Sequence, residues 1–269
     1  MAQDLALECD ALNEVSGMET RRRGGFWMLE DSGNGAELFA VGERGNDLGR
    51  ADIIGVDNED WEDLSSYTEP SGRRMLLIAD TGDNDAERPS VSLISVPEDS
   101  AEQALRRGAA RAEHVWDIRL PTGAADIESA AVEPGTVRAY LLTKREVPAV
   151  LWSMSLGDAH SLMRVGELVL PQPTPAQVEA GGPYAHAASY PTAMDFTDSG
   201  EALIVQTYTD AYVVRRDASG GLDLENPERL PVTKLAQTEA GCVSVDGTWW
   251  FTSEQRPAPL LHVPIPVVE

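Results

Sequence analysis

The sequence predicts an all-β fold built from repeated units, on three observations. The first is a pattern that recurs five times along the 269 residues. In it, an acidic or small residue opens a short strand, a polar turn follows, and a stronger apolar strand ends in a polar cluster. The second is that further strand-like runs follow in each unit, giving about four strands per unit. The third is the spacing of the units along the chain. Four short strands with tight turns fit into roughly 40–50 residues, as in a propeller blade.

The units can be followed in order along the chain. Their opening strand pairs span 14–34, 61–84, 126–145, 191–208 and 238–254. Two more strand-like runs follow in each of the first four units, at 37–41 and 50–56, 91–96 and 114–118, 150–154 and 163–169, and 211–215 and 230–234. The two longer units carry insertions at 100–111 and 172–188. We expect Ser100 to cap a short helix in the first insertion, and Thr174 with Pro175 to begin one in the second.

The fifth unit shows only one further run, 260–265, before the chain ends. We expect its missing strand to come from Asp4–Glu8 at the N-terminus, which would close the ring. The sequence thus predicts a five-bladed β-propeller forming a single domain over residues 1–269. Six blades is the alternative, if an insertion hides a divergent blade. A β-sandwich is a weaker interpretation, because it does not require the same acidic position in successive units.

The charge of the chain excludes some partners. The formal net charge is −24, so a nucleic-acid or anionic-membrane partner would be repelled. No apolar run approaches the roughly 18–20 residues of a membrane helix, so we expect no membrane insertion. The start of the chain shows no signal-peptide pattern. We expect either a cytoplasmic protein or a mature chain with an added Met1, and a monomer.

In a propeller, the start of the first strand and the end of the second strand of each blade lie on the same face. The acidic positions that open the units are Glu14, Glu62, Glu128 and Glu239, with Ala193 in the fourth unit. The residues expected to end the second strands on the same face are Asp31, Asp80, Lys144, Tyr208 and Glu254. The sequence therefore predicts a strongly acidic mouth on the central channel.

Carboxylates that converge on one channel mouth repel each other unless a cation intervenes. Oxygen ligands favour Ca²⁺, with Mg²⁺ as the alternative, over zinc. The predicted metal ligands are Glu14, Glu62, Glu128, Glu239, Asp31 and Asp80. Two alternatives remain open. The glutamates could cap backbone N–H groups and hold the blades together, or the carboxylates could pair with nearby cations, namely Lys144, Arg145, Arg88 and Arg256.

A small molecule or a protein is the expected partner at this mouth. The residues predicted to bind it are Lys144, Arg145, Arg88, Tyr208, Asp83 and Asn84. The common hydrolase and nucleotide-binding motifs are absent from the sequence. If the protein is an enzyme, we expect a metal-dependent hydrolase of esters, lactones or phosphates, with Glu62, Glu128 or His186 as its base. A binding protein without catalytic activity is the other interpretation.

Several motifs resemble those of a family of bacterial, mostly exported β-propeller proteins of unassigned function, some described as lipoproteins or as WD-repeat-like. They include Asp60-Trp-Glu-Asp-Leu64, Asp80-Thr-Gly-Asp-Asn84 and Asp126-Ile-Glu-Ser-Ala130. The resemblance implies a periplasmic or secreted propeller. The acidic channel is also distantly similar to propellers of the regucalcin and gluconolactonase type and of the esterase-like phytase type. These bind a divalent metal in the channel, and some hydrolyse esters or lactones. Ala193 departs from such a ligand set.

The two cysteines lie near opposite ends of the sequence. If the chain ends meet in the last blade, Cys9 and Cys242 lie in the same region. A disulfide would then lock the ring and would suit an exported protein. Two buried free thiols are the alternative, because free cysteine packs as a small apolar side chain.

Overall fold

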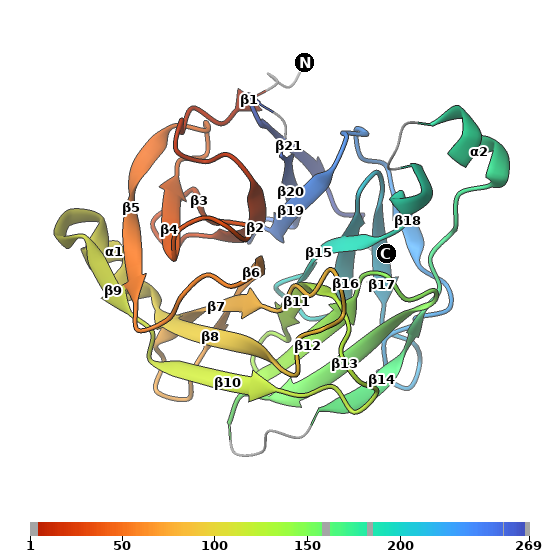
Figure 1. The fold of residues 1–269 in the computed structure, drawn as a ribbon, viewed down its shortest axis with the longest axis horizontal. Coiled ribbons are helices and arrows are strands. Elements are labelled where there is room, and N and C mark those ends of the chain that lie inside the picture. Colours follow the sequence, from red (N-terminus) through yellow and green to blue (C-terminus); the bar gives the residue numbers. More distant parts are fainter. Residues whose placement is uncertain (1–4, 158–161, 182–184, 255, 267–269) are drawn as a thin grey trace.

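The computed structural model describes residues 5–157, 162–181, 185–254 and 256–266. Its strands form five sheets arranged around a central axis, and the predicted five-bladed β-propeller is confirmed (Figure 1). Blade 1 contains β2 (Val15–Thr20), β3 (Phe26–Glu30), β4 (Glu37–Val41), β5 (Asp47–Ile54) and β9 (Ala109–Arg111). Blade 2 contains β6 (Trp61–Thr68), β7 (Arg74–Asp80), β8 (Val91–Pro97) and β10 (His114–Ile118).

The remaining three blades follow in chain order. Blade 3 contains β11 (Ile127–Val132), β12 (Arg138–Thr143), β13 (Ala149–Ser155) and β14 (Met163–Leu168). Blade 4 contains β15 (Pro191–Phe196), β16 (Ala202–Thr207), β17 (Ala211–Arg215) and β18 (Glu228–Leu230). Blade 5 contains β19 (Thr238–Val243), β20 (Thr248–Ser253), β21 (Pro259–Pro264) and β1 (Leu5–Ala6).

The N-terminal strand closes the ring, as predicted. In blade 5, β1 pairs antiparallel with β21, with Leu5 opposite Leu260 and Ala6 opposite Pro259. The next residue, Leu7, donates its backbone N–H to the carbonyl oxygen of Ala258 at 2.8 Å. Of the predicted closing segment, Asp4 lies outside the described residues. The two ends of the chain therefore complete one sheet.

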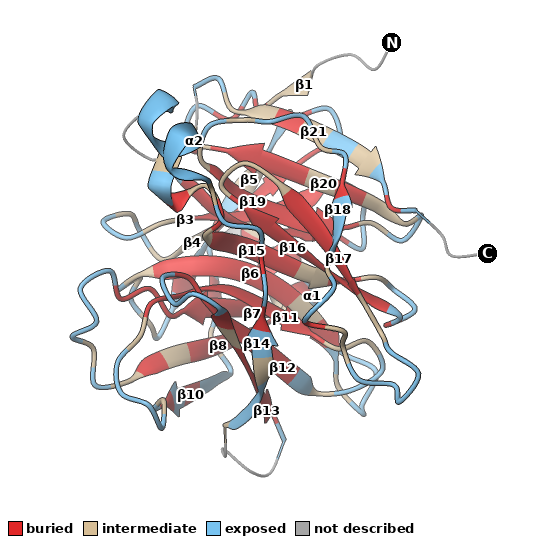
Figure 2. Cartoon of the chain, turned by 90° about the vertical axis from the view of Figure 1, so that its right-hand side faces the viewer, coloured by how far each residue is buried: buried red, intermediate tan, exposed pale blue. Residues whose placement is uncertain are grey.

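The core lies between the blades, where each sheet packs on the next. The innermost strands β2, β6, β11, β15 and β19 each contact the innermost strand of the following blade, and β19 contacts β2. Figure 2 shows these central strands buried along almost their whole length, whereas α2 is exposed. Cys9 and Cys242 share one apolar cluster between blades 5 and 1. Both are buried free thiols, so the disulfide interpretation is wrong.

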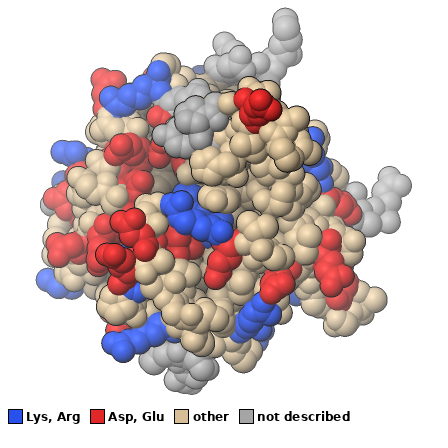
Figure 3. All heavy atoms as spheres, turned by 45° about the vertical axis from the view of Figure 1, so that its right-hand side comes forward, with Lys and Arg blue, Asp and Glu red and all other residues tan. Residues whose placement is uncertain are grey.

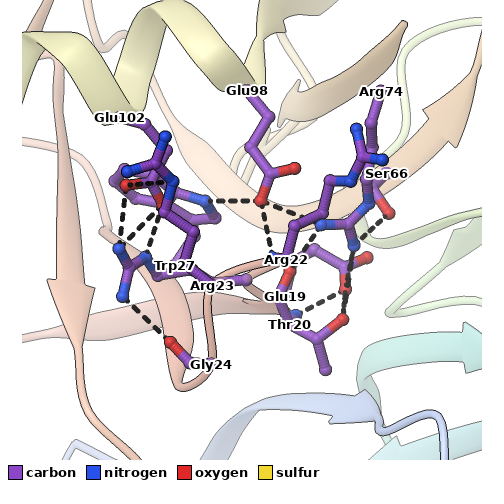
Figure 4. A network of polar contacts seen from close by, with 11 residues as sticks. Glu19, Thr20, Arg22, Arg23, Gly24, Trp27, Ser66, Arg74, Glu98 and Glu102 are labelled. Atoms are coloured by element: carbon purple, nitrogen blue, oxygen red, sulfur yellow. Dashed lines mark hydrogen bonds and ion pairs between the residues drawn. The ribbon is translucent and has the colours of Figure 1, made fainter.

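The insertion after β8 folds into helix α1 (Glu98–Arg107) and strand β9. The helix begins at Glu98, after Pro97, so Ser100 is not its cap, contrary to the sequence prediction. Instead, Glu98 Oε1 accepts hydrogen bonds from Trp27 Nε1 at 3.2 Å and from Arg74 Nη1 at 3.0 Å (Figure 4). These contacts fix α1 on the face where β2 and β6 end. Strand β9 then pairs parallel with β5, which the sequence did not indicate.

The second insertion contains the short helix α2 (Pro175–Ala180) and the 3₁₀ turn η1 (Ala185–Ala187). Thr174 caps α2 as predicted, accepting the backbone N–H of Gln177 while the Gln177 side chain accepts the backbone N–H of Thr174. No helix in the described part of the chain is long and apolar enough to cross a membrane.

Deletion of residues 1–9 should lower the melting temperature sharply. It removes β1 together with Leu7 and Cys9, which are buried in the cluster between blades 5 and 1, and it leaves an open sheet edge on β21. Thermal unfolding followed by circular dichroism measures the change. The variant Leu7→Ser should lower the melting temperature by less, because it keeps the strand pairing. An unchanged melting temperature after deletion would contradict closure by β1.

Candidate functional site at the channel mouth

The innermost strand of every blade contains a β-bulge at its second residue. At this point the pairing with the second strand skips one residue. A bulge leaves its extra residue outside the ladder and turns its side chain in a new direction. The five bulged residues are Ser16, Glu62, Glu128, Thr192 and Glu239.

A backbone hydrogen bond recurs beside each bulge. The residue after the second strand donates its N–H to the carbonyl oxygen of the residue before the innermost strand. The donor and acceptor pairs are Asp31 and Glu14 (3.0 Å), Thr81 and Asp60 (3.1 Å), Lys144 and Asp126 (2.9 Å), Tyr208 and Tyr190 (3.3 Å), and Glu254 and Gln237 (3.4 Å). We call the acceptor the opening position and the donor the closing position. Each blade thus presents an opening, a bulge and a closing position at the same mouth.

This register corrects three assignments made from the sequence. Glu14 occupies the opening position of blade 1, and Ser16 occupies its bulge. In blade 4 the bulge is Thr192, while Ala193 is paired with β16. In blade 2 the closing position is Thr81, because Asp80 still pairs with Trp61. The sequence pattern shows neither which residue is bulged nor where the second strand ends.

Five carboxylates form two groups that share one member. Asp31, Asp60 and Glu62 each offer an oxygen within 4.8 Å of the others, and so do Glu62, Asp126 and Glu128. A Ca²⁺ ion binds its oxygen ligands at about 2.3–2.6 Å, so oxygens on opposite sides of one ion lie up to about 5 Å apart. Three side chains of either group could therefore reach one ion. We call these the outer group (Asp31, Asp60, Glu62) and the inner group (Glu62, Asp126, Glu128).

The inner group is already partly neutralised by two cations. The Lys144 ammonium forms an ion pair with Glu128, and both side chains are buried. The Lys144 nitrogen also lies 5.0 Å from the centre of the Tyr208 ring, a cation–π contact. Arg145 Nε donates to Asp126 Oδ2 at 2.7 Å. The pairing of carboxylates with Lys144 and Arg145, one of the two alternatives to a metal, thus occurs in this group.

The outer group has no such partner. Among the described residues, none of its three carboxylates forms an ion pair with a lysine, arginine or histidine. Asp60 Oδ1 is buried and has no hydrogen-bond partner there. The loop at Gly82 closes over the group, since a Cβ at Gly82 would lie 2.3 Å from Glu62 Oε1 and 2.4 Å from Asp60 Oδ2. The absence of a side chain at Gly82 is what lets these two carboxylates approach the backbone.

Burial and mutual repulsion raise the pKa values of these acids. Burial, then the charge of Asp31, raises the pKa of Asp60 to about 7. Burial raises the pKa of Glu128 to about 8, although Lys144 acts against it. The pKa of Glu62 is well above its usual range, because the side chain is buried and Glu128 lies close. Burial and Glu128 likewise raise the pKa of Glu239. The mouth therefore favours either protons or a further cation.

The other predicted site residues have different surroundings. Asp80 pairs with Arg88 at 2.9 Å and accepts the backbone N–H of Asp60 at 3.1 Å. Asp83 accepts the backbone N–H groups of Glu87 and Arg88, so it stabilises a turn. Asp80 and Asp83 therefore stabilise the local structure of this loop. Asn84 accepts a hydrogen bond from Arg145 at the edge of the mouth.

The remaining candidates lie at the edge of the carboxylate groups or apart from them. Glu254, in the closing position of blade 5, accepts a hydrogen bond from Gln237 at 2.9 Å. Glu14 is exposed and accepts a hydrogen bond from Asn34 at 3.1 Å. His186 is exposed on η1, and its ring lies at 89° to the ring of Tyr190, with 6.3 Å between the ring centres. Neither Glu14 nor His186 belongs to a carboxylate group found in the described chain.

Two other acids perform the cross-blade capping that the sequence suggested for the glutamates. Asp63, next to the bulge of blade 2, accepts the backbone N–H of Ala130 in blade 3 at 2.8 Å and that of Met194 in blade 4 at 3.3 Å. Asp195 in blade 4 accepts the backbone N–H of Val243 in blade 5 at 2.8 Å. These side chains connect neighbouring blades, and Asp63 also connects blade 2 to blade 4 across the channel. Hydrogen bonds between blades are thus made below the mouth, by Asp63 and Asp195.

Sequence reasoning did not single out Asp60 and Asp126 as site residues. A signal for them was available, because the opening and bulge positions read Asp-Trp-Glu in blade 2 and Asp-Ile-Glu in blade 3. The repeated Asp-x-Glu pattern places two carboxylates at one mouth, since the opening residue is held by the closing residue and the bulge turns the glutamate beside it.

Comparisons with known proteins support the fold. The chain is similar to a gluconolactonase structure from Xanthomonas campestris, with 11% identity, a TM-score of 0.53, and coverage of 98% of this chain and 97% of that one. It is also similar to a PQQ-bound aldose sugar dehydrogenase from Streptomyces coelicolor, with 9% identity, a TM-score of 0.52, and coverage of 97% and 96%. A chain of a nidogen/laminin complex matches at 11% identity and a TM-score of 0.52, over 89% of this chain and 72% of that one.

No family model matches this chain, and no curated protein matches it. At such low identity the structural similarities establish the architecture alone, because one propeller fold supports many unrelated functions. The resemblance to β-propellers, gluconolactonase among them, is therefore confirmed at the level of the fold.

Proposed function

We propose that the protein binds a divalent cation, Ca²⁺ in preference to Mg²⁺, in the outer group of the channel mouth, and that the mouth so charged binds a ligand or a partner. One observation carries the proposal: Asp31, Asp60 and Glu62 bring three carboxylate oxygens within 4.8 Å of one another. Within the described chain, no lysine, arginine or histidine is paired with them.

The charge balance of the mouth supports a further cation. Lys144 and Arg145 offset Glu128 and Asp126 in the inner group. The three carboxylates of the outer group, Asp31, Asp60 and Glu62, have no such cation beside them in the described chain. In the view of Figure 3, acidic side chains gather in groups mainly on the left, with basic ones between them, and much of the remaining surface is uncharged. A chain with a net charge of −24 offers few spare cations for the purpose.

The geometry favours Ca²⁺ over Mg²⁺. Mg²⁺ demands a nearly regular octahedron at about 2.0–2.1 Å and keeps most of its waters, whereas Ca²⁺ accepts six to eight oxygens in a looser arrangement. The three carboxylates come from the closing position of blade 1 and from the opening and bulge positions of blade 2. Their arrangement around an ion is therefore irregular. Waters would complete the shell on the open side, and a ligand with carboxylate or phosphate oxygens could replace them.

A second candidate function is a hydrolase of esters, lactones or phosphates. The observation that favours it is the inner group, whose Glu128 lies beside the proposed cation site through the shared Glu62. The metal would polarise a substrate oxygen, and the adjoining carboxylate would accept a proton from water. The similarity to a gluconolactonase is compatible with this candidate but concerns the fold alone.

Removal of divalent cations should destabilise the protein, and Ca²⁺ should restore its stability. A cation at a hundredfold excess over its dissociation constant adds about 2.7 kcal/mol if it binds only the folded chain. At roughly 2–4 °C per kcal/mol, the melting temperature should rise by about 5–10 °C. Asp60→Asn and Glu62→Gln should abolish this response and the heat of Ca²⁺ binding in calorimetry. Glu14→Gln, which removes the same charge from an exposed side chain on the same face, should retain both. Ca²⁺ binding that survives both site variants would refute the assignment.

Without divalent cations, stability should fall as the pH rises from about 5 to about 7. The pKa of Asp60 is about 7 in the folded chain and about 3.9 in an unfolded one. In that window the folded state holds a proton that the unfolded state has released, so raising the pH favours unfolding. Glu62 and Glu239 act with the same sign. Melting temperatures in EDTA should show this decline, Asp60→Asn should reduce it, and Glu14→Gln should not. A melting temperature that rises over this window would contradict the repulsion described for the mouth.

The hydrolase candidate predicts activity that depends on both carboxylate groups. A panel of aryl esters, aldonolactones and aryl phosphates, assayed with Ca²⁺ and with EDTA, should yield one class that is hydrolysed only with the metal. Glu128→Gln should then lower the turnover at least a hundredfold while Ca²⁺ binding in calorimetry persists. Turnover that is absent from the whole panel, with Ca²⁺ bound, would leave the cation-dependent binding protein as the function.

A further inference from the structure

A second hollow lies beside the channel mouth, between blade 4 and the described parts of the second insertion, residues 172–181 and 185–188. It is a cavity of about 790 Å³. Its walls come from residues on both sides of α2, from the end of β16 and from the chain before and after β18. Pockets that bind small organic molecules measure roughly 300–1,000 Å³. The cavity is therefore large enough for a molecule of sugar size.

The cavity is locally cationic in an acidic protein. The charged residues among those that line it are Asp210, Arg229 and Lys234, which leave one positive charge in excess. The chain as a whole carries a formal charge of −24. Near α2, Figure 3 shows mostly uncharged surface. An anion that the rest of the surface would repel can be accepted here.

Asp210 fixes the two cations and leaves most of their donors available. It accepts a hydrogen bond from Arg229 Nη2 and another from Lys234 Nζ at 3.1 Å. Asp210 is itself held by Thr209, whose hydroxyl donates to it at 2.7 Å. Arg229 carries five N–H donors and Lys234 three, and in the described chain each uses one nitrogen for Asp210. Both side chains are about 60% exposed, so their free donors can meet a ligand.

The other walls suit an organic molecule better than an inorganic ion. Tyr208 and Tyr212 contribute aromatic surface, and Ser189, Gln172 and Gln237 contribute neutral hydrogen-bonding groups. Such groups bind hydroxyls and apolar faces together. Tyr208 also connects this cavity to the channel mouth, because its ring contacts Lys144.

We propose that this cavity binds a small hydroxylated organic anion, with its carboxylate or phosphate on Arg229 and Lys234 and its hydroxylated part against Tyr208 and the insertion. The site is distinct from the proposed cation site and goes beyond the function proposed above. It uses no metal, so it should operate equally in EDTA and in Ca²⁺.

Calorimetry at low ionic strength in EDTA tests the site with three probes: glycerate, ribose 5-phosphate and neutral ribose. At least one charged probe should bind with a dissociation constant below about 1 mM, and ribose at least tenfold more weakly. Comparison of glycerate with ribose 5-phosphate shows whether a carboxylate or a phosphate is preferred. Binding of neither charged probe, or equal binding of ribose, would overturn the proposal.

Two variants separate the cations from the cavity. The double variant Arg229→Gln with Lys234→Gln should weaken anion binding at least tenfold, whereas Arg164→Gln should not change it. Arg164 is a matched control, because it is an exposed arginine on β14 that is paired with Glu167 outside the cavity. Ala236→Trp should also weaken binding, since it fills the cavity without changing its charge. Unaltered affinity in Ala236→Trp, with its melting temperature preserved, would show that anions bind only to the outer surface and would overturn the cavity assignment.

Discussion

One backbone hydrogen bond, repeated in every blade, determines what lies at the channel mouth. It joins the residue after the second strand to the residue before the innermost strand. Together with the bulge beside it, this bond holds three side chains per blade at one face. Because the backbone geometry is the same in all five blades, the composition of the mouth depends only on which residues occupy these positions. Blades 2 and 3 place Asp and Glu there, and blade 4 places Tyr190 and Thr192.

The acidic residues of the channel differ in their hydrogen bonding. Below the mouth, Asp63 is buried and Asp195 is half-buried, and both accept backbone N–H groups from other blades, although desolvation raises the pKa of each well above its usual range. At the mouth, Asp60 has a buried oxygen without such a donor. The same residue type therefore serves cohesion in one layer and is left unsatisfied in the next. That contrast, more than the number of acids, distinguishes the mouth from the rest of the channel.

Much of the architecture could be predicted from the sequence, because strand repeats and turns are local signals. Five units, the closing N-terminal strand and the Thr174 cap were all visible. The site was predicted less well, since its positions depend on bulges that no residue type announces. Glu14 was assigned to a position two residues from the bulge, and Asp80 to the position next to the closing residue. Helix α1 begins without a side-chain cap, and its Glu98 is held by Arg74 and Trp27 from other strands, so its start could not be found locally.

Strand β9 bears on whether one molecule can associate with another through its sheet edges. Each blade ends outward on a strand whose free backbone groups could recruit another chain. In blade 1, β9 covers the edge of β5 and becomes the outer strand itself, with only three residues. Blades 4 and 5 end on β18, which has three residues, and on β1, which has two residues in the described part of the chain. The longer outer strands β10 and β14 carry charges, Asp117 on one and Arg164 and Glu167 on the other. Addition of a strand from another chain is thus disfavoured at the outer edges of the blades, because the outer strands are short or carry charged side chains and because β9 covers the edge of β5.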